Sequence, residues 1–139
     1  IPTDHPARNI ILVVSAADSE GRELEHVGEQ VVQAWGGVGD GPDDYGGRPG
    51  RGYAKVLEEL WTEVSPSVAY WNPTVVREDS RIPARATDVT RYEFRAPSQG
   101  QEVVVEAKVI FRRAFKLLAQ QKRWDVPDIL MEIEQARVD

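Results

Sequence analysis

Three aspartates in a glycine-rich stretch are the first residues whose type and spacing could support chemistry. Asp40, Asp43 and Asp44 lie within the run GGVGDGPDDYGG. Calcium is held in proteins by roughly six to eight oxygen ligands, many of them carboxylates. These aspartates could supply part of such a shell, although no glutamate stands where an EF-hand loop requires one. We therefore predict either a calcium site or a solvated acidic loop.

A pair of adjacent aromatic residues is the second candidate. Tyr70 and Trp71 stand in the run AYWNP, between a serine–proline pair and a β-branched segment. Exposed aromatic rings stack on sugars and anchor protein interfaces, because they offer a large flat surface with a polar edge. Buried aromatic rings serve the core instead. We predict an interface or a carbohydrate platform at this pair, with core packing as the alternative.

The connector DSRIPARATDVTRYEF, residues 79–94, carries two opposite charges just before a segment of alternating residues. The pair Ile82–Pro83 favours extended backbone, since a residue before proline avoids the helical region. One interpretation is a covered connector, with Ile82 tucked into the core and Arg81 paired with a nearby carboxylate. The other is a surface for a neighbouring domain, to which Asp79 and Arg81 would contribute.

Signatures of catalysis are missing from the sequence. No serine stands in a G-x-S-x-G turn, and the glycine run matches neither the dinucleotide pattern nor the Walker pattern. A glycosidase pair of carboxylates can come from distant positions, and 23 acidic residues do not select one. We assign no catalytic residue and expect no activity in this chain, with a hydrolase as the least favoured alternative.

The charge balance and the missing cysteines exclude several classes. The chain has 23 acidic and 17 basic residues and a net charge of −6, which predicts no nucleic-acid binding. It has no cysteine, so disulfides, zinc–thiolate sites and covalent haem attachment are excluded within it. Its apolar runs fall short of the roughly 20 residues of a membrane span.

The length of 139 residues fits one domain, residues 1–139. The sequence begins with Ile1 and no signal-like apolar block follows it. We expect a processed chain or, more specifically, a C-terminal fragment of a larger protein.

Several segments could position these residues. The run NIILVVSAAD, residues 9–18, predicts a buried strand, because it is apolar and β-branched. Eight glycines and two prolines in residues 36–52 predict a long loop. The spacing of apolar residues in YAKVLEELW, residues 53–61, predicts a helix. Residues 67–76 predict the start of a strand.

The second half of the chain reads mainly as strands. Residues 87–96 and residues 102–113 both alternate apolar and polar side chains, and a turn at 97–101 joins them, so we predict a hairpin. Residues 114–124 predict a helix, and residues 129–134 alternate as a final strand. The whole pattern predicts a mainly β fold: a β-sandwich, immunoglobulin-like in outline, with one or two short helices and the long glycine-rich loop.

A family resemblance covers roughly residues 35–133. The ordered segments WGGVGDG, YGGRPGRGYAKVL, AYWNPTVVREDSRIPA, TRYEFRAP, VEAKVIFRRAF and WDVPDILME resemble the C-terminal region of large bacterial multihaem c-type cytochromes. Those proteins carry repeated C-x-x-C-H motifs, and this chain has none. The resemblance therefore implies the haem-free, β-rich terminal domain of such a protein.

That resemblance implies a function and a location. The chain would be a non-catalytic accessory domain of an exported electron-transfer protein, in the periplasm or outside the cell. It would pack on the haem-bearing part, which carries haem c, or dock a redox partner. His5, near the start of the chain, is the one residue that could reach a haem as a distal ligand. The alternative is a secreted binding module for carbohydrate or calcium.

Overall fold

A computed structural model describes residues 1–2, 5–97 and 101–138. These residues form a mainly β protein with two antiparallel sheets and one α-helix. The predicted mainly β class is confirmed. None of the helices in these residues is long and apolar enough to cross a membrane.

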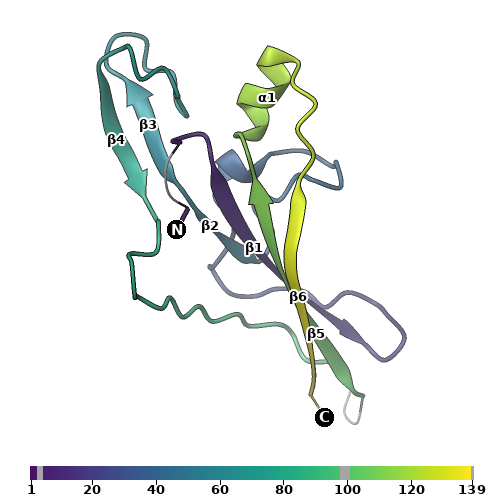
Figure 1. The fold of residues 1–139 in the computed structure, drawn as a ribbon. Coiled ribbons are helices and arrows are strands. Elements are labelled where there is room, and N and C mark those ends of the chain that lie inside the picture. The colour runs from purple at the N-terminus through teal and green to yellow at the C-terminus, as the bar shows by residue number, and fades with distance from the viewer. Residues whose placement is uncertain (3–4, 98–100, 139) are drawn as a thin grey trace.

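The larger sheet contains four strands in the order β2-β1-β5-β6 (Figure 1). The strands are β1 (Asn9–Asp18), β2 (Gly50–Tyr53), β5 (Val103–Arg112) and β6 (Ile129–Val138). Strand β5 pairs along its length with β1 on one side and with β6 on the other. The predicted strands at 9–18, 102–113 and 129–134 are confirmed, and β6 extends beyond the last of them.

The smaller sheet is a hairpin of β3 (Lys55–Glu59) and β4 (Thr74–Asp79), which projects from one end of the larger sheet (Figure 1). The predicted helix at 53–61 is wrong. Leucine, glutamate and lysine are good helix formers, but helix propensity is a weak preference that tertiary pairing overrides. Here the β-branched run of β4 supplies a pairing partner, and the chain stays extended.

Strands β2 and β3 are one stretch of extended chain, interrupted only by Ala54. Ala54 is fully buried, and Ser80 forms hydrogen bonds with Ala54 itself and with Gly52. The Ala54 N–H donates to Ser80 Oγ at 3.0 Å, and the Ser80 hydroxyl donates to the Gly52 carbonyl at 2.9 Å. The Ser80 N–H donates to the Ala54 carbonyl at 3.0 Å. The root of the hairpin is therefore clamped.

The predicted hairpin between residues 87–96 and β5 is wrong. Strand β5 already has β1 and β6 as partners, and residues 87–96 make a single bridge, between Phe94 and His26. The alternation is nevertheless real, because Tyr92 and Phe94 are half-buried while Arg91 and Glu93 are exposed. The predicted turn at 97–101 lies partly outside the described residues.

The glycine-rich loop is confirmed over most of its predicted length, but its last residues form β2. Glycine is needed there for close approach. A Cβ on Gly50 would lie 2.1 Å from the Leu12 carbonyl oxygen, and one on Gly52 would lie 2.3 Å from the Trp35 ring. The helix predicted at 114–124 is confirmed as α1 (Lys116–Lys122), and a 3-10 turn, η1, spans Ala34–Gly36.

Among the described residues, buried apolar side chains form two small clusters, and Trp35 packs against both. Ile11, Val32 and Ile110 form the cluster in the larger sheet. The other cluster lies between β3 and α1 and contains Ala54, Val56 and Phe115. Trp35 meets Phe115 edge to face, with ring centroids 5.5 Å apart. The core therefore lies beneath η1 and α1.

Candidate functional site

The acidic loop residues are held by a lysine. The ammonium of Lys116 lies 2.9 Å from Asp43 Oδ1 and 2.5 Å from Asp44 Oδ1, and the Gly41 N–H donates to Asp44 Oδ2. The hydrogen bond from Lys116 lowers the pKa of both carboxyl groups. Asp40 is exposed in the same loop. In the described ranges no three His, Asp or Glu side chains are grouped to hold a metal ion.

A buried arginine fixes the same loop from the sheet side. The Arg112 side chain is 3% exposed and forms two 2.7 Å hydrogen bonds with the carboxylate of Asp128. It also donates to the carbonyls of Gly36 and Asp43 at 2.9 and 2.8 Å, and its guanidinium lies over the Tyr45 ring. Sequence reasoning missed Arg112 and Lys116, because an ion pair between distant residues leaves no local pattern.

His5 lies exposed in the segment before β1. Its Nδ1 accepts a 3.2 Å hydrogen bond from the Ala7 N–H, so Nε2 is the nitrogen left for a ligand. Its role as a haem ligand stays a prediction.

The connector residues Asp79 and Arg81 pair with each other. Arg81 Nε and Nη2 donate to the two oxygens of Asp79 at 2.7 and 2.6 Å, and these bonds lower the pKa of Asp79 to about 2. The neighbouring Ile82 is half-buried, and its N–H donates to the Ile1 carbonyl at 3.1 Å. The geometry therefore shows the ion pair of the covered-connector interpretation, but residues 83–87 are exposed, so the connector is not covered. The interface role of Asp79 and Arg81 stays a prediction.

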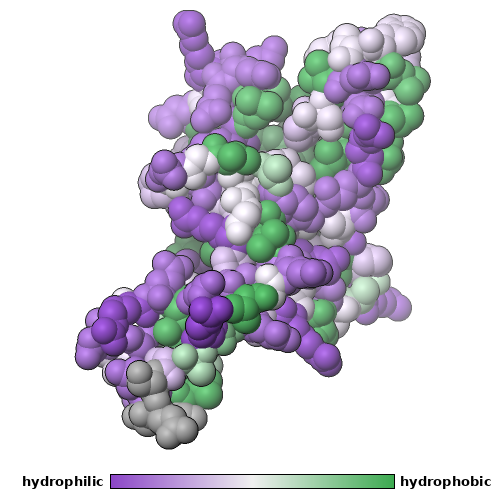
Figure 2. Space-filling view, turned by 180° about the vertical axis from the view of Figure 1, so that it is seen from behind, coloured by the Kyte–Doolittle hydropathy of each residue, from purple (hydrophilic) through white to green (hydrophobic). Residues whose placement is uncertain are grey.

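The predicted aromatic pair lies at the end of the β3–β4 hairpin, together with a second tryptophan. We call residues 60–73 the aromatic tip. Trp61, Tyr70 and Trp71 are 79%, 79% and 71% exposed. The Tyr70 and Trp71 rings meet edge to face at 5.1 Å. Figure 2 shows pale and hydrophobic surface at the upper right, where the hairpin ends. The interpretation as core residues is wrong for these three rings.

One carboxylate organises the aromatic tip. Glu59 accepts hydrogen bonds from Thr62 Oγ1 at 2.8 Å, Ser67 Oγ at 2.9 Å and Asn72 Nδ2 at 3.2 Å. The bonds from Thr62 and Ser67 lower the pKa of Glu59. The tip is therefore held in one shape while its rings face solvent, and a preordered anchor loses less entropy on binding.

The last strand is the least covered element of the sheet. Every residue of β6 is exposed, including Leu130, Met131 and Ile133. One face of the β5–β6 pair, which we call the open face, follows from the register, because opposed residues point to the same side. It comprises Val103, Val105, Ala107, Val109, Phe111, Ile129, Glu132, Glu134, Ala136 and Val138.

The other face of the same strands has its charges paired. Glu106 lies 2.5 Å from the ammonium of Lys108 and accepts a 2.7 Å hydrogen bond from Gln135. These bonds lower the pKa of Glu106. Arg137 pairs with Glu102 at 3.2 Å. The charges on this face are therefore satisfied within the chain.

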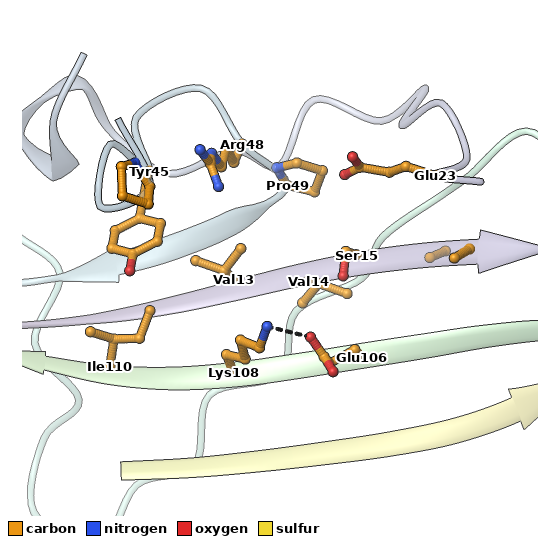
Figure 3. A pocket seen from close by; sticks show the side chains of 13 residues that line it. Val13, Val14, Ser15, Glu23, Tyr45, Arg48, Pro49, Glu106, Lys108 and Ile110 are labelled. Carbon is orange, nitrogen blue, oxygen red and sulfur yellow. Dashed lines mark ion pairs between the residues drawn. The ribbon is translucent and has the colours of Figure 1, made fainter. Parts of the chain in front are cut away.

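A hollow of about 390 Å³ lies on this second face, between the sheet and the loop (Figure 3). Tyr45, Arg48 and Pro49 form its loop side, and the pair Glu106–Lys108 lies on its sheet side. That pair is neutral as a whole, so the hollow offers no net charge from the sheet to attract an ion.

The exposed area of the chain is larger than its mass predicts. It amounts to 9,288 Å², against about 7,300 Å² for a typical folded monomer of 15.6 kDa. A stable interface takes about 800 Å² from each partner. The excess, about 2,000 Å², is therefore enough for a large interface.

Comparisons with protein-family models, with curated proteins and with solved structures found no match.

Proposed function

We propose that this chain is a non-catalytic accessory domain that packs against another protein surface. The observation that carries the proposal is strand β6, which is exposed along all ten of its residues. Proteins normally shorten, charge or cover the edge strands of their sheets, because a free edge pairs with other chains. A long edge strand with exposed leucine, methionine and isoleucine is suited to an interface.

The excess exposed area supports the same proposal. Strand β6 and the aromatic tip carry about half of the exposed large apolar side chains of the described residues. Interfaces are enriched in tyrosine, tryptophan and methionine relative to other surfaces. The rigid tip would then provide an anchor, and the exposed side chains of β6 would provide area.

We base a proposal for the parent protein on the resemblance to multihaem c-type cytochromes. In it the chain would be the haem-free domain of an exported multihaem cytochrome, periplasmic or extracellular, with haem c in the parent. The domain would pack on the haem-bearing part or dock a redox partner. The predicted sandwich, immunoglobulin-like in outline, belongs to this proposal, with a layer from the partner lying over the open face.

The test begins with the protein isolated from its source. An absorption spectrum and an intact mass should show a Soret band and a mass well above 15.6 kDa. Hydrogen exchange should then show the outward-facing β6 amides, those not bonded to β5, protected in the whole protein and open in the isolated chain. A colourless monomer of this mass would contradict the cytochrome parent. Equal exchange in the two forms would contradict packing through β6.

A second candidate function rests on the aromatic tip. Tyr70 and Trp71 expose their rings as sugar-binding platforms do, so a secreted carbohydrate-binding module is the alternative. A glycan that binds only the folded chain would raise its melting temperature. Trp71→Ala should abolish that shift, and Trp124→Ala, at another half-exposed tryptophan, should keep it.

Calcium binding is also open to this assay. The single positive charge of Lys116 already pairs with Asp43 and Asp44, so Asp40 is the carboxylate of the loop outside this pairing. Calcium should therefore raise the melting temperature less than a glycan would.

A further inference from the structure

We infer that the free edge of β6 binds an extended segment of a partner protein that carries lysine or arginine at two alternate positions. Those basic side chains would face Glu132 and Glu134. This inference rests on the proposed function and specifies the chemistry of the partner at the same site.

The backbone of β6 offers a place for another strand. The strand bonds to β5 on one side, and it is the last strand of its sheet on the other. Its outer N–H and C=O groups therefore lack strand partners among the described residues. An extended peptide can add to such an edge, with affinity from backbone hydrogen bonds and selectivity from alternate side chains.

The side chains of the open face define that selectivity. Glu132 stands opposite Val109 and Glu134 stands opposite Ala107, so both side chains leave the strand on the open face. Glu132 Oε1 also accepts a 3.2 Å hydrogen bond from the Ile133 N–H. Their neighbours there are apolar. No lysine or arginine of the described residues forms an ion pair with either glutamate, whereas Arg137 on the other face is paired with Glu102.

A partner that covers the open face must offset the cost of removing water from the two glutamates. A carboxylate that loses water without gaining a partner destabilises the complex strongly, and a partner cation offsets that cost. A surface that covers β6 must therefore bring positive charge to Glu132 and Glu134. Directly opposed strand residues lie about 5 Å apart, so lysine or arginine at alternate positions of one strand can meet both.

A second copy of the chain does not bring positive charge to Glu132 and Glu134. Two copies of β6 paired antiparallel about a two-fold axis keep their open faces on the same side. The two registers with the longest overlap are centred on Ile133 and on Glu134. The first puts Glu132 opposite Glu134 twice, and the second puts Glu134 opposite itself. Like charges directly opposite each other are destabilising, so the occupant is a different, basic strand.

The test uses a short capped peptide in which lysine alternates with valine, labelled for fluorescence anisotropy. Two control peptides carry glutamate in place of lysine, or a central proline that stops strand pairing. Only the lysine peptide should bind the isolated chain. Glu132→Gln with Glu134→Gln should weaken that binding about five- to tenfold, because two cross-strand ion pairs are lost. Glu29→Gln, at an exposed carboxylate outside β6, should leave it unchanged.

The outcomes separate this inference from the proposed function. Equal binding of the lysine and glutamate peptides would contradict the inference that the partner strand must carry basic side chains. Self-association of the double variant without peptide binding would show that the carboxylates only prevent dimers, and would also overturn it. If no peptide binds while the β6 amides are protected in the whole protein, this inference fails and the proposed function stands. If those amides stay open there, the proposed function fails too.

Discussion

Strands β1 and β6 are equally long and both pair with β5, yet one is buried and the other is exposed. Ile11 and Ala16 of β1 have almost no accessible surface, while Leu130 and Met131 of β6 are more than half exposed. Both sequences are rich in apolar residues. The difference shows that strand pairing alone buries little, because burial depends on what covers the faces.

The chain itself covers β1. Strand β2 and β5 occupy its two edges, and the segment that contains Val32 and Tyr45 packs over one of its faces. Strand β6 has only β5. Other parts of the chain cover β1, whereas a partner protein would cover β6. The difference between these two strands can be tested by substitution.

The largest difference is expected between two isoleucines. Ile11 is fully buried in β1, and Ile133 is 41% exposed in β6. Ile11→Ala should lower the free energy of unfolding by about 4 kcal/mol, because it leaves a cavity. Ile133→Ala should lower it by less than about 1 kcal/mol. Urea unfolding measures both, and equal losses would remove the contrast between the strands.

The second comparison concerns two arginines. Arg112→Ala leaves Asp128 and two carbonyls without their donor, so we expect a loss of about 3 kcal/mol. Arg137→Ala removes an exposed pair, and its effect should stay within about 0.5 kcal/mol. Arg112→Lys should fall between them, because lysine keeps the charge but not the forked geometry. A full rescue by lysine would contradict the bidentate role.

A smaller effect should appear in the pH dependence of stability. The pKa values of Asp43 and Asp44 are lowered in the folded chain, so their contribution is present above about pH 4 and is lost as the pH falls through the lowered values. Lys116→Met removes the cause of the lowering. The variant should be less stable than the wild type at neutral pH, and the gap should close as the pH falls below the lowered pKa values.

The matched control for that titration is Arg137→Met, next to Glu102 at the end of β6. This pair is more exposed than the lysine pair, so its variant should show no such gap. A gap that persists in acid for Lys116→Met would instead indicate lost packing of its side chain.

The smallest effect on stability is expected at the aromatic tip. Trp71→Ala should change the free energy of unfolding by less than about 0.5 kcal/mol, because the ring is exposed. The same variant should weaken association with the partner, since tryptophans are frequent hot spots. Glu59→Gln offers a contrast within the tip, because it alters an acceptor of three hydrogen bonds and leaves the rings in place.

The sequence predicted β1, β5, β6 and α1, since their patterns are local and strong. It did not predict β3, because the run around Leu57 fits a helix, and only pairing with β4 keeps it extended. It detected the alternation around Tyr92 but assigned the wrong partner. Alternation identifies the faces of a segment and not the strand beside it.

The candidate site was predictable to a similar degree. The adjacent rings of Tyr70 and Trp71 were recognised, while Trp61 was placed on a helix that does not form. The unpaired state of Glu132 and Glu134 depends on which cations lie nearby in space. No sequence spacing encodes that, just as none encoded the bonds of Arg112.

The clamped root of the β3–β4 hairpin has a mechanical consequence. Ala54 joins two strands without a loop, and Ser80 forms hydrogen bonds with Ala54 and Gly52 at this junction. A force on the aromatic tip therefore passes along one extended backbone into β2 and then into β1. The hairpin is connected to the sheet without a flexible loop, so the movement of a partner bound at the tip would be transmitted to the whole domain.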